Sequence, residues 1–262
     1  MQRVPQSEFS KYLGAAASPA TISRLLRGEV APNERDLQGF AAVLDIPLET
    51  LGALRILDSI PDGRMLATPG LLGYMLVGSK TLLLSGLTMG LGVGQLRAAR
   101  PTQPTTILVD IVSPDRLPEI EKRWTSWESG DTLAAWLSVG RTLAGIAANK
   151  PDLTVRLWAR DSEFVDADHE PPTGEIVAND WFALESPPPY SAAPFFKVRF
   201  YGDSRWSSFI EPLKRDLAEK ETGSRRRLLW DSSNAATDAG FIEQLGTACD
   251  KVSRLGVRKG LV

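Results

Sequence analysis

Runs of large aliphatic residues alternate with helix-like segments along the C-terminal part of the chain, and this alternation limits the fold more than any other sequence feature. The runs at 81–87 (TLLLSGL) and 105–112 (TTILVDIV) have the apolar content expected of buried strands. Residues 94–100 between them and residues 116–148 after them have helical character. Because strands that alternate with helices pack as layers around a sheet, we expect residues 71–262 to form an α/β domain with a mixed sheet.

The same patterns predict the rest of this domain. The segment at 241–259 is an amphipathic helix with Ile242 and Val252 on its apolar side. Three consecutive arginines, Arg225–Arg227, are interpreted as part of a solvated linker. Further strands are expected at 153–159, 175–180 and 195–201, and a further helix at 206–220.

The first sixty residues have a different sequence pattern, which consists of four short amphipathic segments separated by helix caps. Ser18 is a favoured N-cap, and Pro19 occupies the first helical position, where its missing N–H costs nothing. Gly28 has the place of a glycine that ends a helix, and Asn33 can cap the next one. We therefore expect an α+β chain of two domains: an N-terminal all-α domain over residues 1–60, joined by a linker at 61–70 to the α/β domain.

The runs FSKYLG, SPATISRLLRGEVAP and LQGFAAVLDI resemble the lambda-repressor-like (xenobiotic-response-element type) helix-turn-helix family. The resemblance covers roughly residues 5–57 and includes a Thr-Ile-Ser-Arg core followed by a glycine and a proline. It implies a sequence-specific, bacterial-type transcriptional regulator whose partner is double-stranded DNA. Only five residues precede Gln6, fewer than the first helix of that family needs, and the turn after Leu13 is about two residues longer than usual.

The segment from Pro19 to Gly28 has the chemistry of a helix that lies in a DNA groove. It contains no acidic residue, and its N-terminal end presents free N–H groups to phosphate. Arg24 and Arg27 can bind either phosphate or the O6 and N7 atoms of guanine. The DNA-binding residues predicted from this segment and the resemblance are Gln6, Ser18, Ala20, Thr21, Ser23, Arg24 and Arg27.

Composition narrows the remaining function classes. The chain has 43% hydrophobic and 24% charged residues and a net charge of -2, so DNA binding must come from local placement of charge. A single cysteine, Cys249, excludes an intrachain disulfide and is typical of a reducing cytoplasm. We expect no cofactor, no structural metal and no membrane partner. A homodimer and a small-molecule effector are the further partners that a regulator of this type implies.

Residues 71–262 resemble, more weakly, a phospholipase D-like fold through the runs TLLLSGLTMG, VRLW and APFFKVRFYGDSRW. Enzymes of that family need a histidine–lysine–aspartate set, and the sole histidine, His169, stands in an acidic Pro-flanked segment without it. The resemblance thus implies a catalytically degenerate domain that binds an effector or dimerises. Two alternatives stay open: an enzyme acting on a nucleotide or phosphodiester, and a protein-interaction module that has lost DNA binding.

We expect Arg24→Ala and Arg27→Ala to weaken DNA binding without unfolding the protein, because both side chains lie off the apolar face of their helix. Losing a contact to guanine should cost about 1–3 kcal/mol and relax base preference at one position. Losing a phosphate contact should lower affinity evenly and reduce the salt slope by about one. Fluorescence anisotropy with a selected duplex measures both, and an unchanged affinity in the double variant would contradict the assignment.

Overall fold

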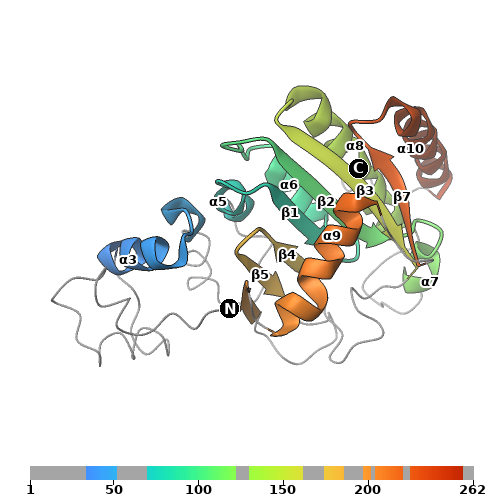
Figure 1. Ribbon diagram of the computed structural model, residues 1–262. Helices are drawn as coiled ribbons and strands as arrows, with labels where there is room; N and C mark the ends of the chain where they lie inside the picture. Colours follow the sequence, from blue (N-terminus) through green and yellow to red (C-terminus); the bar gives the residue numbers. More distant parts are fainter. Residues whose placement is uncertain are drawn as a thin grey trace.

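A computed structural model describes residues 34–51, 70–121, 130–161, 174–185, 197–201, 204–220 and 225–255. Its centre is a seven-stranded mixed sheet with strand order β6-β5-β4-β1-β2-β3-β7 (Figure 1). The sheet and its helices confirm the predicted α+β architecture. The strands are β1 (Thr81–Ser85), β2 (Thr105–Val112), β3 (Leu153–Arg160), β4 (Ile176–Ala178), β5 (Phe182–Glu185), β6 (Lys197–Phe200) and β7 (Arg226–Asp231). The helices are α3 (Glu34–Leu44), α5 (Leu71–Leu76), α6 (Gly90–Leu96), α7 (Leu117–Glu121), α8 (Asp131–Asn149), the π-helical turn η2 (Trp206–Ile210), α9 (Glu211–Glu219) and α10 (Ala235–Leu255).

Three parallel strands form the middle of the sheet. β1 pairs with β2 and β2 with β3 in parallel, whereas β4 joins β1 and β7 joins β3 in antiparallel orientation. In β2 all residues except Thr106 are buried. A strand covered on both faces needs apolar residues at successive positions, which explains why the run TTILVDIV is apolar from Ile107 to Val112 except at Asp110.

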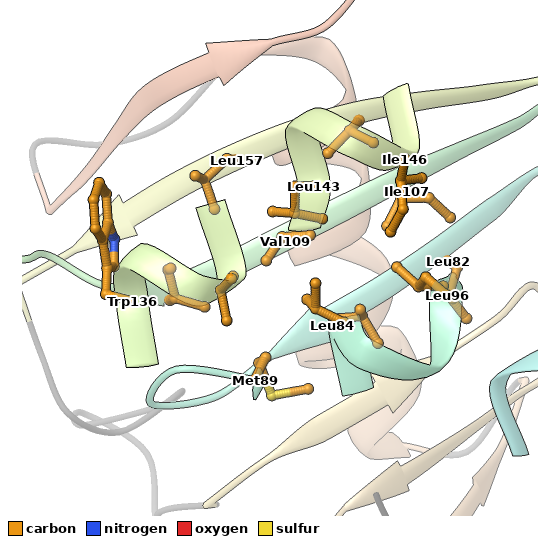
Figure 2. Packing of buried hydrophobic residues seen from close by; sticks show 14 of the residues in the cluster. Leu82, Leu84, Met89, Leu96, Ile107, Val109, Trp136, Leu143, Ile146 and Leu157 are labelled. Carbon is orange, nitrogen blue, oxygen red and sulfur yellow. The ribbon is translucent and has the colours of Figure 1, made fainter. Parts of the chain in front are cut away.

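One face of the sheet is covered by α6, α8 and α10 (Figure 1). Alternate strand residues meet these helices, because successive side chains point to opposite faces of a strand. Figure 2 shows Leu84 and Val109 of the sheet beside Leu143 of α8. The residues labelled in this core are Leu82, Leu84, Met89, Leu96, Ile107, Val109, Trp136, Leu143, Ile146 and Leu157.

The opposite face is covered, within the described residues, by the continuous helix formed by η2 and α9 (Figure 1). The strand residues of opposite parity, Leu83, Leu108 and Trp158, are buried here. They pack against side chains that η2 and α9 present at helical spacing, namely Trp206, Ile210, Leu213 and Leu217. The two cores together fix the register of the parallel strands, since a one-residue slip would exchange them.

Buried polar contacts fasten the ends of the helices. The Glu121 carboxylate accepts hydrogen bonds from the backbone N–H of Gly130 (2.9 Å) and of Thr132 (2.8 Å) at the start of α8. A carboxylate at this end also interacts favourably with the helix dipole. At the end of α6, the Lys150 ammonium donates to the carbonyl oxygens of Leu96 and Ala99. Each charge therefore satisfies backbone groups that the helix itself leaves unpaired.

Several predicted elements are confirmed, and others need correction. The strands expected at 105–112 and 153–159 are present as β2 and β3, and the apolar run at 81–87 contains β1. The helix expected at 94–100 in fact begins at Gly90 and ends at Leu96. Its glycine-rich start lowers helix propensity, but packing of Val93 and Leu96 into the core outweighs that cost.

The interpretation of Arg225–Arg227 as a solvated linker is wrong for Arg226 and Arg227, which belong to the edge strand β7. Burial of Leu229 and Trp230, which follow the arginines, stabilises this strand. The placement of Ile242 on the apolar side of the last helix is also wrong, because its side chain is 62% exposed. Phe241 is buried instead and stacks on Trp230 at a ring distance of 4.7 Å.

Two glycines of α8 provide a matched test of the packing between α8 and α10. A methyl group at Gly140 would lie 2.5 Å from Cδ2 of Leu245 and 3.3 Å from Cζ of Phe241, whereas one at Gly145 would meet nothing within 4 Å. We expect Gly140→Ala to destabilise the protein by about 1 kcal/mol, because overpacking exceeds the gain in helix propensity. Gly145→Ala should stabilise it by about 0.5–1 kcal/mol. Urea denaturation followed by circular dichroism measures both, and the same sign for the two variants would contradict this packing.

Candidate functional site

The residues predicted to contact DNA lie outside the described part of the chain, and their role stays a prediction. They are Gln6, Ser18, Ala20, Thr21, Ser23, Arg24 and Arg27. The helix expected after Pro32 is described and confirmed as α3. It ends at Leu44, the next residue, Asp45, adopts a left-handed conformation (φ 53°), and the N–H of Ile46 donates to the carbonyl oxygen of Ala41 (3.0 Å).

Four polar side chains meet at the carboxyl ends of the parallel strands, and we call them the carboxyl-edge cluster: Ser85, Asp110, Arg160 and Arg226. Asp110 stands between the other three. Its Oδ2 accepts a hydrogen bond from Oγ of Ser85 (2.7 Å) and one from Nη1 of Arg160 (3.0 Å). Its Oδ1 lies 3.4 Å from Nε of Arg226. One carboxylate thus contacts strands on both sides of β2.

The register of the strands explains why these four side chains lie close together. Ser85 is the register partner of Asp110, and each follows a large apolar residue, Leu83 or Leu108, by two positions. Side chains two positions apart in a strand point to the same face, so the cluster lies on the face that η2 and α9 cover. Arg160 ends β3, and its cross-strand neighbour in β7 is Arg226.

Arg160 is the most deeply buried cation of the cluster, with 2% of its side chain exposed. Its Nη1 donates to the backbone oxygen of Asp110 (2.8 Å), and its Nη2 donates to the backbone oxygen of Gly86 (2.6 Å). Burial lowers the pKa of Arg160, Asp110 raises it, and the nearby Arg226 lowers it again. The ion pair with Asp110 therefore offsets the loss of hydration that burial imposes on the guanidinium.

A further acidic residue lies beside this edge. Glu175 precedes β4, and its Cγ is so close to Gly86 that an added methyl group there would lie 3.0 Å from it. Burial raises the pKa of the Glu175 carboxyl above its ordinary value. These side chains lie at the carboxyl ends of β1, β2 and β3, the end of a parallel sheet outside which open α/β folds bind ligands.

Two other buried ionic groups join α9 to the sheet. The Asp231 carboxylate lies 3.2 Å from Nε of Arg156 and 2.8 Å from Nζ of Lys220. Burial raises the pKa of Asp231, but the contacts with Lys220, Ser233 and Arg156 outweigh it and lower the pKa to about 2. Because the pKa is lowered on folding, the stability from Asp231 is present above about pH 4 and is lost as the pH falls towards 2. Lys214 donates to Asp180 (3.1 Å) and to the carbonyl oxygen of Asn179, and burial lowers its pKa. All of these contacts lie within the fold, which gives these residues a structural role.

His169, the residue on which catalytic interpretations depend, lies outside the described residues. In the part of the chain that the structure describes, no three His, Cys, Asp or Glu side chains are grouped as metal ligands. No helix in that part has the length and apolar character needed to cross a bilayer. Of the tryptophans, Trp136 and Trp158 are core residues, and Trp181 lines an open depression of about 700 Å³ together with Gln38, Ala42 and Leu48.

A helix-turn-helix family model matches residues 2–51 of the chain. No curated protein and no solved structure matches it. The matched segment includes α3 and the whole stretch that resembles a DNA-groove helix, so the N-terminal part supports a DNA-binding regulator of the xenobiotic-response-element type. The comparisons give no support to the phospholipase D-like resemblance, which stays a prediction.

Substitution of Asp110, the central carboxylate of the carboxyl-edge cluster, tests how much this cluster contributes to the free energy of unfolding. We expect Asp110→Ala to destabilise the α/β domain by about 3–5 kcal/mol, because it leaves the buried Arg160 without its counter-ion. Asp115→Ala is a matched control, since Asp115 is mainly exposed and lies 3.7 Å from an exposed Arg227. The control should change stability by less than about 0.5 kcal/mol. Urea denaturation measures both, and equal effects would show that the cluster is not a stabilising element.

Proposed function

We propose that the chain is a sequence-specific DNA-binding transcriptional regulator that acts in the cytoplasm as a homodimer. The observation that carries the proposal is the helix-turn-helix match over residues 2–51. Within it, the segment around Arg24 and Arg27 is basic and free of acidic residues. Such a segment can contact phosphates and guanine edges even though the net charge of the chain is -2.

The α/β domain has the role of effector binding or dimerisation in this proposal. The carboxyl-edge cluster marks the candidate position for an effector, because ligands of open α/β sheets bind outside the carboxyl ends of the parallel strands. Asp110 Oδ1 is buried and, although Arg226 lies near it, accepts no hydrogen bond in the described part of the chain.

A non-catalytic role for this domain is part of the same proposal. The sequence contains one histidine and none of the spacings of the common nucleophile or phosphate-binding motifs. The polar contacts of Arg160 are made to Ser85, Gly86 and Asp110, as expected of a binding or structural cation.

Dimerisation follows from the number of charges that one module can offer. A single module with two useful arginines would neutralise few phosphates, and non-specific binding of such modules is only about 10⁻⁴–10⁻⁶ M. Two modules in one particle make the second contact intramolecular. The proposed dimer reads two inverted half-sites whose centres lie about 34–36 Å, or a multiple of this, apart.

Selection of duplexes from a random pool by the full chain tests the function. We expect enrichment of one inverted repeat, bound by two copies in sedimentation velocity, with a dissociation constant that rises steeply with salt. The double variant Arg24→Ala/Arg27→Ala should lose this binding. Arg254→Ala, which removes an exposed arginine of α10, should retain it. A pool without enrichment, or a monomer both free and on DNA, would contradict the proposal.

A further inference from the structure

The last residues of the helix-turn-helix match lie against the α/β domain. Oγ1 of Thr50, which is fully buried, donates a hydrogen bond to the backbone oxygen of Val77 (2.8 Å). Trp181, in the turn between β4 and β5, packs against the small apolar cluster of α3 and the residues after it. We call these contacts the inter-domain joint, formed by Pro47 and Thr50 on one side and by Val77, Gly78 and Trp181 on the other.

The approach of the two sides is closest at Gly78. This residue has a φ of +68°, in the left-handed region that favours glycine. An added methyl group would lie 2.9 Å from Cγ of Pro47 and 3.4 Å from Cη2 of Trp181. The joint therefore brings backbone, a proline ring and an indole ring into direct contact.

The α/β side of the joint is held firmly by its own hydrogen bonds. The N–H of Gly78 donates to Oγ1 of Thr102 (2.8 Å), and the side-chain amide of Gln103 donates to the Gly78 oxygen. The backbone N–H of Trp181 donates to Oδ1 of Asn179 (3.0 Å), and the backbone oxygen of Trp181 accepts from the N–H of Tyr201 (2.7 Å). A surface restrained in this way has few alternative conformations to offer its partner.

We infer that the joint holds α3 and the residues up to Leu51 in one fixed orientation on the α/β domain, and that the state with this joint closed is the one that binds DNA. The contacts of the joint are made by α3 and the residues up to Leu51, and none is made by the seven predicted DNA contacts, which all lie before residue 28. The contacts of the joint therefore do not include any of those seven residues. The DNA-binding half of this inference rests on the proposed function, whereas the fixed orientation does not.

A disulfide across the joint tests both halves. The Cβ of Pro47 lies 3.9 Å from the position that a Cβ on residue 78 would occupy, within the range of about 3.5–4.5 Å found in disulfides. The variant is Pro47→Cys/Gly78→Cys in a Cys249→Ser background, because Cys249 is the chain's only cysteine. Oxidised glutathione serves as the oxidant, and each single-cysteine variant serves as a control.

We expect the disulfide to form in more than nine tenths of the folded protein and the unfolding midpoint of the oxidised variant to rise above that of its reduced form. The oxidised and reduced forms should bind the selected duplex with dissociation constants within threefold of each other. Failure to form the disulfide in folded protein would overturn the fixed orientation. A disulfide that weakens DNA binding more than threefold would overturn the closed state as the binding state. If no duplex is selected at all, the proposed function fails, while disulfide formation still tests the joint.

The variant Trp181→Ala provides a second test that does not require a cysteine at position 78, and Trp181→Phe is its matched control. We expect amide hydrogen exchange of residues 40–51 to become at least tenfold faster in Trp181→Ala and to stay near the wild-type rate in Trp181→Phe. Exchange in β2 should not change, since that strand is paired on both sides within the sheet and nearly all of its residues are buried. Unchanged exchange at 40–51 in Trp181→Ala would overturn the inference.

Discussion

The guanidinium of Arg160 joins the carboxyl ends of all three parallel strands. It belongs to β3, it binds the side chain and backbone oxygen of Asp110 in β2, and it reaches Ser85 and the Gly86 oxygen at the end of β1. Every connection that leaves the parallel strands starts from this edge. Because a buried guanidinium is tolerated only when its donors are satisfied, the position of these strand ends and the ionisation of the cluster depend on each other.

The sequence predicts the middle of this fold well and its periphery poorly. The mainly apolar run of β2 identifies a strand without help from its neighbours, as does that of β1. The pattern around β7 does not predict a strand, because Arg226 and Arg227 suggest solvent, whereas the structure pairs Arg226 with Asp110. β5 is four residues long and obtains its stability from the paired strands β4 and β6, so no local pattern identifies it.

The carboxyl-edge cluster is likewise absent from the sequence-based expectations, although a signal for it exists. Asp110 is the one charged residue inside the apolar run of β2, and Arg160 ends a strand that is otherwise mainly apolar. A charge in such a strand predicts a buried partner. Which partner it is depends on the strand order, and this is tertiary information that a sequence pattern of a few residues does not contain. The DNA-binding residues, by contrast, are predicted from local chemistry and family resemblance alone.

The irregularity in β7 has a consequence for how tightly this edge strand is specified. Its pairing with β3 shifts between Leu157 and Trp158, where one extra residue is accommodated. Arg226 and Asp231 are five positions apart, an odd number, so a regular strand would point them to opposite faces. The extra residue corrects this parity, and both reach ionic partners, Asp110 and Arg156, on one face of the sheet. An edge strand whose two ends are each secured by an opposite charge cannot slide by one residue without losing both, which protects it from mispairing with the edge of another molecule.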